Sequence, residues 1–267
     1  MNKDKRLEAF GRLLDVMDEL RVKCPWDRVQ TFESLRSSTI EETYELVDAL
    51  LDHDMKNVKK ELGDLLLHVI FYSKIASEEG AFDIADVADT ECDKLIFRHP
   101  HVFGAMHADT PDEVKQNWED LKLKEKEKEH EKKRVLSGVP RTLPSLVKAY
   151  RISQKAASAG FEWETKEDIW SKVQEEISEV QTAMQSGDEV NKEEEFGDLL
   201  FALVNAARLY GVNAETALEK CNKKFISRFT YIEEQAEKQG LSLRELSLAE
   251  MENWWCEAKN KAKEKTE

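Results

Sequence analysis

Few residues in this sequence interrupt a helix, since 267 residues include only 5 prolines and 10 glycines. Because proline and glycine disfavour helix interiors, their scarcity favours a largely helical chain. The four cysteines are scattered without a CxxC pair or a metal-ligand spacing, which predicts a reduced, cytoplasmic protein without a thiolate metal site. The sequence also lacks a signal-like N-terminal segment and an apolar run of membrane-spanning length, so we expect no membrane partner.

Basic residues are in the minority, and the formal net charge is −15. Such a charge disfavours binding to nucleic acid or to an anionic membrane. It would equally repel an anionic substrate, unless a cation lay between the substrate and the protein. Charged residues make up 36% of the chain and apolar residues 40%, a balance typical of helical proteins with a sizeable core.

Apolar residues recur at helical spacing, and no segment is convincing as a strand. The first half is expected to form helices over residues 7–20, 40–51, 58–76 and 84–97, with another beginning near 110–113. Thr39 is a candidate N-cap for the second of these helices, with Glu42 at the capping-box position. The third is apolar over so much of its surface that we expect it deep in a bundle.

The second half repeats the plan of the first, and it repeats a set of carboxylates. Residues 41–66 and 175–200 align without a gap. Both copies contain EExxE followed by ExxD, and the matching positions are Glu41, Glu42, Glu45, Glu61, Gly63 and Asp64 in the first copy and Glu175, Glu176, Glu179, Glu195, Gly197 and Asp198 in the second.

A charged segment and two prolines separate the two copies. Residues 122–134 alternate in charge without apolar partners, which is typical of a solvated linker. Pro140 and Pro144 follow and mark a boundary. We therefore predict an all-α chain of two tandem helical bundles, with domains over 1–121 and 145–267 and a linker over 122–144.

The spacing of the carboxylates points to a metal site. Residues three and four apart share one face of a helix, so each motif presents its side chains together. Antiparallel packing of the two helices would join both sets into a ring of oxygen ligands, which suits Mg²⁺, with Mn²⁺ as the alternative. The predicted metal ligands are Glu42, Glu45, Glu61 and Asp64 in the first copy and Glu176, Glu179, Glu195 and Asp198 in the second.

Two other interpretations compete with a magnesium site. Paired glutamates on helices usually lie in solvent, but Asp64 is placed among leucines, where an unpaired charge is costly. A di-iron site requires an ExxH pair, whereas both copies have ExxD. His68 follows Asp64 by four residues but has Ala202 as its counterpart, so we expect a packing histidine. Gly63 and Gly197 each cost roughly 1 kcal/mol in a helix, and we expect a backbone or ligand to approach closely there.

An ordered series of further motifs runs through the chain. It comprises CPWD at 24–27, IEETYE at 40–45, ELGDLLLHVIFYSKIASEEGAFD at 61–83, RHPHVFG at 98–104 and SGVPRTLPSLVKAYRISQKAASAGFEW at 137–163. With the two carboxylate motifs, this series resembles the two-domain bacterial form of the MazG family of nucleoside triphosphate pyrophosphohydrolases, over nearly the whole chain. The resemblance implies a homodimer of MazG-like bundles that uses Mg²⁺ to hydrolyse NTPs and dNTPs between the α and β phosphates.

The resemblance also implies roles for particular residues. One glutamate of each EE pair would position or deprotonate the attacking water. Glu41 and Glu175 are preferred over Glu42 and Glu176, although the spacing leaves open which of each pair is the base. Parallel KxxxR and WxxxK motifs resemble a phosphate clamp and a base-stacking aromatic: Lys94, Arg98, Trp118 and Lys122 in the first half, and Lys224, Arg228, Trp255 and Lys259 in the second. Solvated cations and packing tryptophans are the alternative.

The second copy is expected to dominate catalysis. Lys172 and Lys192 flank its carboxylates, and the first copy has no lysine at the same offset. Each charge-assisted contact to a triphosphate is worth roughly 1.5–3 kcal/mol. Lys59 and Lys60 lie one and two residues beyond the position that matches Lys192. They are candidate substitutes for it, but this shift along the helix is expected to point them elsewhere. The family also tends to place its activity in its C-terminal half. A nucleotide- or metal-sensing scaffold with decayed sites is the rival function, although both carboxylate sets are intact.

Overall fold

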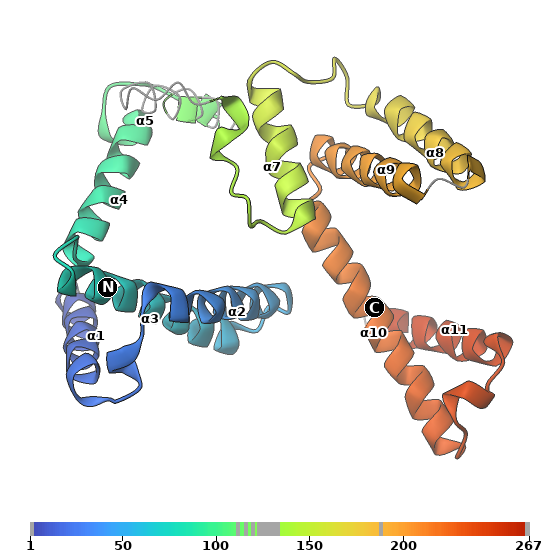
Figure 1. Cartoon of the computed structure of the whole chain (residues 1–267), viewed down its shortest axis with the longest axis horizontal. Helices are drawn as coiled ribbons and strands as arrows, with labels where there is room; N and C mark the ends of the chain where they lie inside the picture. Colours follow the sequence, from blue (N-terminus) through green and yellow to red (C-terminus); the bar gives the residue numbers. More distant parts are fainter. Residues whose placement is uncertain are drawn as a thin grey trace. The chain divides into compact units, whose positions relative to one another are not determined.

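The computed structural model describes residues 3–110, 113–114, 117–118, 121, 134–186 and 189–264. Across these residues the chain is helical and contains no strand, which confirms the all-α prediction. The chain divides into two compact units, Met1–Glu125 and Lys126–Glu267 (Figure 1). Most of the linker predicted over 122–144 lies outside the described residues, so its bounds stay a prediction. None of the described helices is long and apolar enough to cross a membrane.

The first unit is a helical assembly centred on a long hairpin. It comprises α1 (Lys3–Lys23), η1 (Asp27–Val29), α2 (Phe32–Leu51), α3 (Met55–Glu78), α4 (Ile84–Arg98) and the short α5 (Pro100–Phe103). α2 and α3 lie side by side in opposite directions. Asp54 caps α3, because its carboxylate accepts hydrogen bonds from the backbone N–H groups of Lys56 (3.1 Å) and Asn57 (3.2 Å). This tight connection sets the register of the two helices.

The start of α2 differs from the predicted one. Thr31 is the N-cap: its hydroxyl accepts a hydrogen bond from the Ser34 N–H (3.2 Å), and the Ser34 hydroxyl accepts one from the Thr31 N–H (2.9 Å). The predicted N-cap at Thr39 is therefore wrong. Thr39 lies inside the helix, where its hydroxyl donates to the Leu35 carbonyl oxygen (3.0 Å), an arrangement open to threonine in mid-helix.

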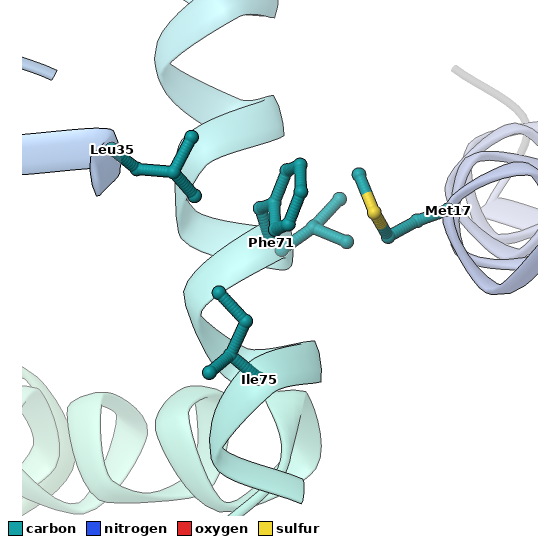
Figure 2. Packing of buried hydrophobic residues seen from close by; sticks show 5 residues of the cluster. Met17, Leu35, Phe71 and Ile75 are labelled. Atoms are coloured by element: carbon teal, nitrogen blue, oxygen red, sulfur yellow. The ribbon is translucent and has the colours of Figure 1, made fainter. Parts of the chain in front are cut away.

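The core of the first unit lies where α1, α2 and α3 meet. Its buried side chains are Met17, Leu35, Ile70, Phe71 and Ile75. Figure 2 shows Phe71 between Leu35 on one side and Met17 on the other. This cluster holds α3 against both neighbours and so fixes the position of the hairpin.

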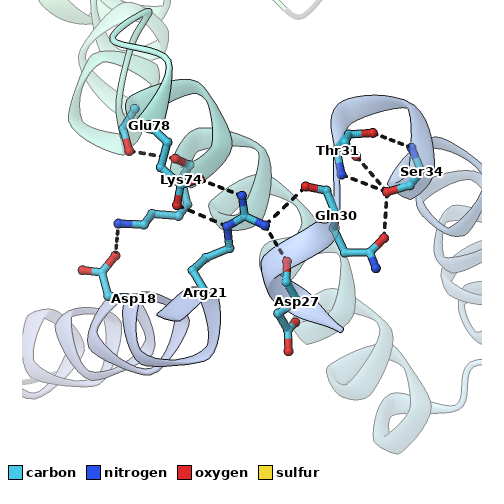
Figure 3. A network of polar contacts seen from close by, with 9 residues as sticks. Asp18, Arg21, Asp27, Gln30, Thr31, Ser34, Lys74 and Glu78 are labelled. Atoms are coloured by element: carbon cyan, nitrogen blue, oxygen red, sulfur yellow. Dashed lines mark hydrogen bonds and ion pairs between the residues drawn. The ribbon is translucent and has the colours of Figure 1, made fainter. Parts of the chain in front are cut away.

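Arg21 connects α1 to the loop that precedes α2. Its guanidinium donates to both carboxylate oxygens of Glu78 (3.2 and 2.6 Å) and to the carbonyl oxygens of Asp27 and Gln30 (Figure 3). The hydrogen bonds that Arg21 donates to Glu78 raise the pKa of Arg21, and the same bonds are the chief cause of the lowered pKa of Glu78. These contacts anchor the loop before α2.

α3 is less buried than the sequence predicts. One face packs on α1 and α2, but Leu62, Leu66 and Val69 are 53%, 37% and 44% exposed. In the second unit, Phe196 and Leu200 of α9 (Glu189–Leu209) are exposed as well. The apolar surface of these helices exceeds what the neighbouring helices of one unit cover, so a position deep in a bundle is wrong for the single chain.

The second unit repeats the hairpin with different neighbours. It comprises η2 (Val135–Gly138), α7 (Ser145–Ser158), α8 (Ile169–Ser186), α9 (Glu189–Leu209), α10 (Ala214–Lys238), η3 (Leu243–Glu245) and α11 (Leu248–Glu264). α8 and α9 lie side by side, and α7 packs against α9 and α10. A core of Ile169, Val173, Ala202 and Ala206 joins α8 to α9. The two alanines allow the helices to approach closely.

Candidate metal centre

Each hairpin brings carboxylates of both its helices together. In the first unit, one oxygen from each of Glu42, Glu45 and Glu61 lies within 4.8 Å of the others; in the second, the same is true of Glu176, Glu179 and Glu195. The spacing of the motifs and the antiparallel packing account for both groups. The predicted meeting of the two motifs is confirmed for three carboxylates in each copy, while their roles as ligands stay predictions.

The remaining predicted carboxylates lie at the edge of these groups or beyond it. Asp64 is half-buried and close enough to raise the pKa of Glu42, but its oxygens are not among those within 4.8 Å. Asp198 is exposed, as are Glu41 and Glu175. Glu175 accepts a hydrogen bond from Lys172 at 3.0 Å. The three clustered carboxylates of each unit thus form an inner set. The outer set comprises Glu41, Asp64, Glu175 and Asp198.

The first cluster contains a lysine that the sequence reasoning placed elsewhere. Lys60 Nζ lies 3.0 Å from both carboxylate oxygens of Glu61, 3.4 Å from Asp64 Oδ2 and 3.7 Å from Glu45 Oε2. The expectation that Lys60 points away is wrong, because its long stem lets the ammonium group reach the carboxylates from two residues beyond the position that matches Lys192. A signal was present in the sequence, since Lys60 precedes Asp64 by four residues, a spacing that favours ion pairs.

The electrostatics of the first cluster reflect its crowded negative charge. Glu61 is only 5% exposed, and its hydrogen bonds raise the pKa of Lys60. Loss of hydration raises the pKa of Glu42, and the charges of Asp64 and Glu45 raise it further. The cluster therefore favours a cation near its carboxylates, and Lys60 supplies one.

The second cluster is less completely neutralised. Glu176 is 4% exposed, and its Oε1 lies 2.8 Å from Lys172 Nζ. Its other oxygen, Oε2, is buried and has no hydrogen-bond partner among the residues that the structure describes. Partial loss of hydration raises the pKa of Glu179 where its carboxyl faces the cluster, and the charge and hydrogen bond of Glu176 raise it further. Lys192 lies 2.7 Å from Glu189 instead, at the start of α9.

This arrangement fits a divalent cation. A buried carboxylate oxygen without a partner is costly and calls for a positive charge or a donor. The group around Glu176 offers only oxygen ligands, which suit hard cations such as Mg²⁺ and Mn²⁺ rather than zinc or redox metals. The unpaired oxygen and the oxygen ligands around it therefore make the second cluster one that could hold a divalent cation.

His68 takes no part in these groups. Its Nδ1 lies 2.9 Å from the Thr39 hydroxyl, which is also 2.7 Å from the Tyr72 hydroxyl. Burial lowers the pKa of His68. The prediction of a packing histidine is confirmed, and the ExxH pair of a di-iron site has no counterpart among these residues.

The glycines beside the carboxylates are not explained by packing within one chain. A Cβ atom added to Gly63 or Gly197 would meet nothing within 4 Å among the described residues. The expected close approach of a backbone is therefore wrong for the chain by itself. Each glycine instead lies on the exposed part of its helix.

The cations and aromatics of the KxxxR and WxxxK motifs meet in both halves. The Arg228 guanidinium lies over the Trp255 ring at 5.2 Å, and that of Arg98 lies over Trp118 at 5.4 Å. Lys224 and Lys259 are exposed, and Lys94 pairs with Glu91. Lys122 lies outside the described residues. The second-half group sits on α10 and α11, whereas the carboxylates sit on α8 and α9, so different helix pairs supply them.

The sequence reasoning missed an aromatic partner of this group. The ring of Phe225, which directly follows Lys224, is centred 5.1 Å from that of Trp255. Phe225 is 57% exposed. The two ring planes are inclined by 59°, so the exposed Phe225 ring adds apolar surface beside Trp255 at an angle to it.

These features define a class of protein: an all-helical chain with a repeated hairpin whose carboxylates form a cluster able to hold a metal ion. Comparison with protein families agrees, since residues 30–103 and 164–232 match the MazG nucleotide pyrophosphohydrolase domain. The two matches cover the two carboxylate hairpins. The chain belongs to the MazG family.

Similar proteins span almost the whole chain. The nucleoside triphosphate pyrophosphohydrolase/pyrophosphatase MazG of Thermotoga maritima is 43% identical over 252 residues, covering 94% of this chain and 95% of that protein. The nucleoside triphosphate pyrophosphohydrolase of Escherichia coli K12 is 42% identical over 258 residues, covering 95% and 98%. The uncharacterized protein YabN of Bacillus subtilis is 44% identical over 253 residues, but these make up only 51% of its length.

Proposed function

We propose that this chain is a Mg²⁺-dependent nucleoside triphosphate pyrophosphohydrolase that cleaves NTPs and dNTPs between the α and β phosphates. The products are a nucleoside monophosphate and pyrophosphate. The proposal is supported by the family and by the names of relatives that match nearly end to end. In the structure, the observation that carries it is the buried, unpaired oxygen of Glu176 among three clustered carboxylates.

Glu176, Glu179 and Glu195 would hold the metal in the second unit, with Asp198 as the outer ligand. Glu42, Glu45, Glu61 and Asp64 would do so in the first. Bound Mg²⁺ would bridge the polyphosphate and lower the pKa of an attacking water. Mn²⁺ is the expected substitute because it shares the preference for oxygen ligands. Positive charge at the cluster also removes the repulsion between an anionic substrate and a chain of net charge −15.

Outer residues would position the water and the substrate. Glu175 is exposed beside Glu176, so it can orient or deprotonate a water without being a ligand, as Glu41 can in the first unit. Lys172 lies next to the second cluster and is placed to contact phosphate oxygens.

Further cations and an aromatic side chain complete the proposed substrate site. Lys192, Lys224 and Arg228 would add phosphate contacts, and Trp255 would stack on the base, with Lys259 beside it. Lys94, Arg98, Trp118 and Lys122 are the corresponding residues of the first half. Because stacking discriminates poorly among bases, we expect broad base tolerance and a role in removing aberrant or excess nucleotides.

A homodimer is part of this proposal. The exposed apolar side chains of α3 and α9 need a cover, and a second copy of the chain would provide one. The scattered thiols favour a cytoplasmic location.

Identification of the products after incubation with ATP or a dNTP tests the function. We expect equal amounts of monophosphate and pyrophosphate, loss of turnover in EDTA, and recovery with Mg²⁺ or Mn²⁺ but little with Ca²⁺, which favours looser and longer coordination. No GxxxxGK[ST] loop is present to cradle a γ-phosphate. A diphosphate plus orthophosphate would contradict the proposed reaction, full activity after metal stripping would contradict the metal, and no turnover with any triphosphate would favour a sensing scaffold.

A further inference from the structure

The two carboxylate clusters differ in how a lysine enters them. In the first, Lys60 Nζ reaches carboxylates of both helices: Glu45 on α2 at 3.7 Å, and Glu61 and Asp64 on α3 at 3.0 and 3.4 Å. In the second, Lys172 Nζ contacts Glu175 and Glu176, both on its own helix, at 3.0 and 2.8 Å. The ammonium of Lys60 therefore bridges the hairpin, as a metal ion would.

The two lysines leave the buried carboxylates of the clusters, Glu61 and Glu176, with different hydrogen bonding. Both oxygens of Glu61 accept hydrogen bonds from Lys60. In the second cluster, Glu176 Oε2 is buried without a hydrogen-bond partner. The first cluster is thus satisfied without a metal, while the second retains an unmet demand for positive charge.

The difference arises from two exchanges in the repeat. The residue that corresponds to Lys60 in the second copy is Glu194, and the residue that corresponds to Lys172 in the first copy is Ser38. Since Glu61 and Glu195 occupy matching places on α3 and α9, the residue before each of them has the same register relative to its cluster.

We propose that Lys60 is a built-in competitor of the divalent metal, which makes the first cluster the weak metal site and the second the tight one. A metal ion can enter the first cluster only if the ammonium leaves Glu45, Glu61 and Asp64. The Lys60 side chain is 59% exposed, so it can move into water. The competition therefore lowers metal affinity without abolishing it. The inference rests on the proposed function in one respect, namely that these clusters bind a divalent cation.

Binding of Mn²⁺ to the full-length protein, followed by the electron paramagnetic resonance signal of free Mn²⁺, tests this inference without measuring activity. Lys60→Met removes the ammonium and keeps the length of the stem. Lys59→Met is the matched control, because Lys59 is an exposed neighbour and its replacement makes the same change in net charge. Measuring both in a Glu176→Gln background isolates the first cluster.

We expect Lys60→Met to tighten Mn²⁺ binding at the first cluster by about tenfold, the scale of one charge-assisted hydrogen bond, and Lys59→Met to change it by less than about twofold. Glu194→Lys, which places a lysine at the same register in the second copy, should weaken the tight site by a similar factor. If Lys60→Met binds Mn²⁺ no better than Lys59→Met, the competition is refuted while the metal sites stand. If the wild-type chain binds no Mn²⁺, the metal assignment fails with it.

Discussion

Replacing Glu176 with glutamine should stabilise the metal-free protein while removing the response of the second cluster to metal. Glu176 is 4% exposed and its Oε2 lacks a partner. An unsatisfied buried group costs about 1–3 kcal/mol. The amide would place an N–H donor where the unpaired Oε2 lies, within the same cluster as the carboxylate of Glu179. The amide oxygen can still accept from Lys172. We therefore expect metal-free Glu176→Gln to gain about 1–3 kcal/mol, or roughly 3–10 °C in Tm.

The same change should weaken metal binding at the second cluster. A metal present at a hundred times the Kd of the second cluster stabilises the wild type by about 2.7 kcal/mol through that cluster. This part of the gain should be lost in the variant, while any gain from the weaker first cluster remains. Scanning calorimetry in EDTA and then in excess Mn²⁺ gives both quantities. Glu194→Gln is the control, because it removes one charge from an exposed position nearby. A variant that loses stability in EDTA and keeps the full gain from Mn²⁺ would refute the reasoning.

Three further predictions concern stability. Met17→Ala should lower the free energy of unfolding by about 2–5 kcal/mol, because Met17 is only 1% exposed and lies in the core of the first unit. Urea unfolding measures this loss. Arg21→Met should lower the free energy of unfolding by about 2 kcal/mol, also measured by urea unfolding. This figure allows for screening by solvent, because the Glu78 side chain is 40% exposed. In EDTA, the pKa of Glu179 is raised in the folded state. Its contribution to the free energy of unfolding is therefore present at low pH and is lost as the pH rises above 4.5, the ordinary pKa of a glutamate. Glu179→Gln should therefore flatten the fall in Tm above that pH in a calorimetric series.

Helical periodicity accounts for most of what the sequence could predict. The spacing of EExxE and ExxD fixes which side chains share a helix face, and a short turn such as the one capped by Asp54 leaves antiparallel packing as the simple outcome. The meeting of Glu42, Glu45 and Glu61 follows from these two facts. The repeat then predicts the second cluster.

The errors arose where side-chain reach or a local hydrogen bond decided the outcome. The position of Lys60 along the helix predicts that it points away, but the stem of a lysine reaches the carboxylates from two residues beyond the position that matches Lys192. The sequence predicts a cap at Thr39, but Thr31 and Ser34 form the reciprocal cap upstream. The exposure of Leu62 could not be predicted, since the pattern shows that a face is apolar but not what covers it.

Product analysis of paired variants under saturating Mg²⁺ and ATP most directly tests whether the chain is a pyrophosphohydrolase whose second cluster carries most of the activity. The wild type should release AMP and pyrophosphate in equal amounts. Glu42→Ala, in the lysine-filled first cluster, should keep much of this turnover, and Glu176→Ala, at the unpaired oxygen of the second, should lose most of it. Release of ADP and orthophosphate, equal losses in the two variants, or a larger loss in Glu42→Ala would contradict the account.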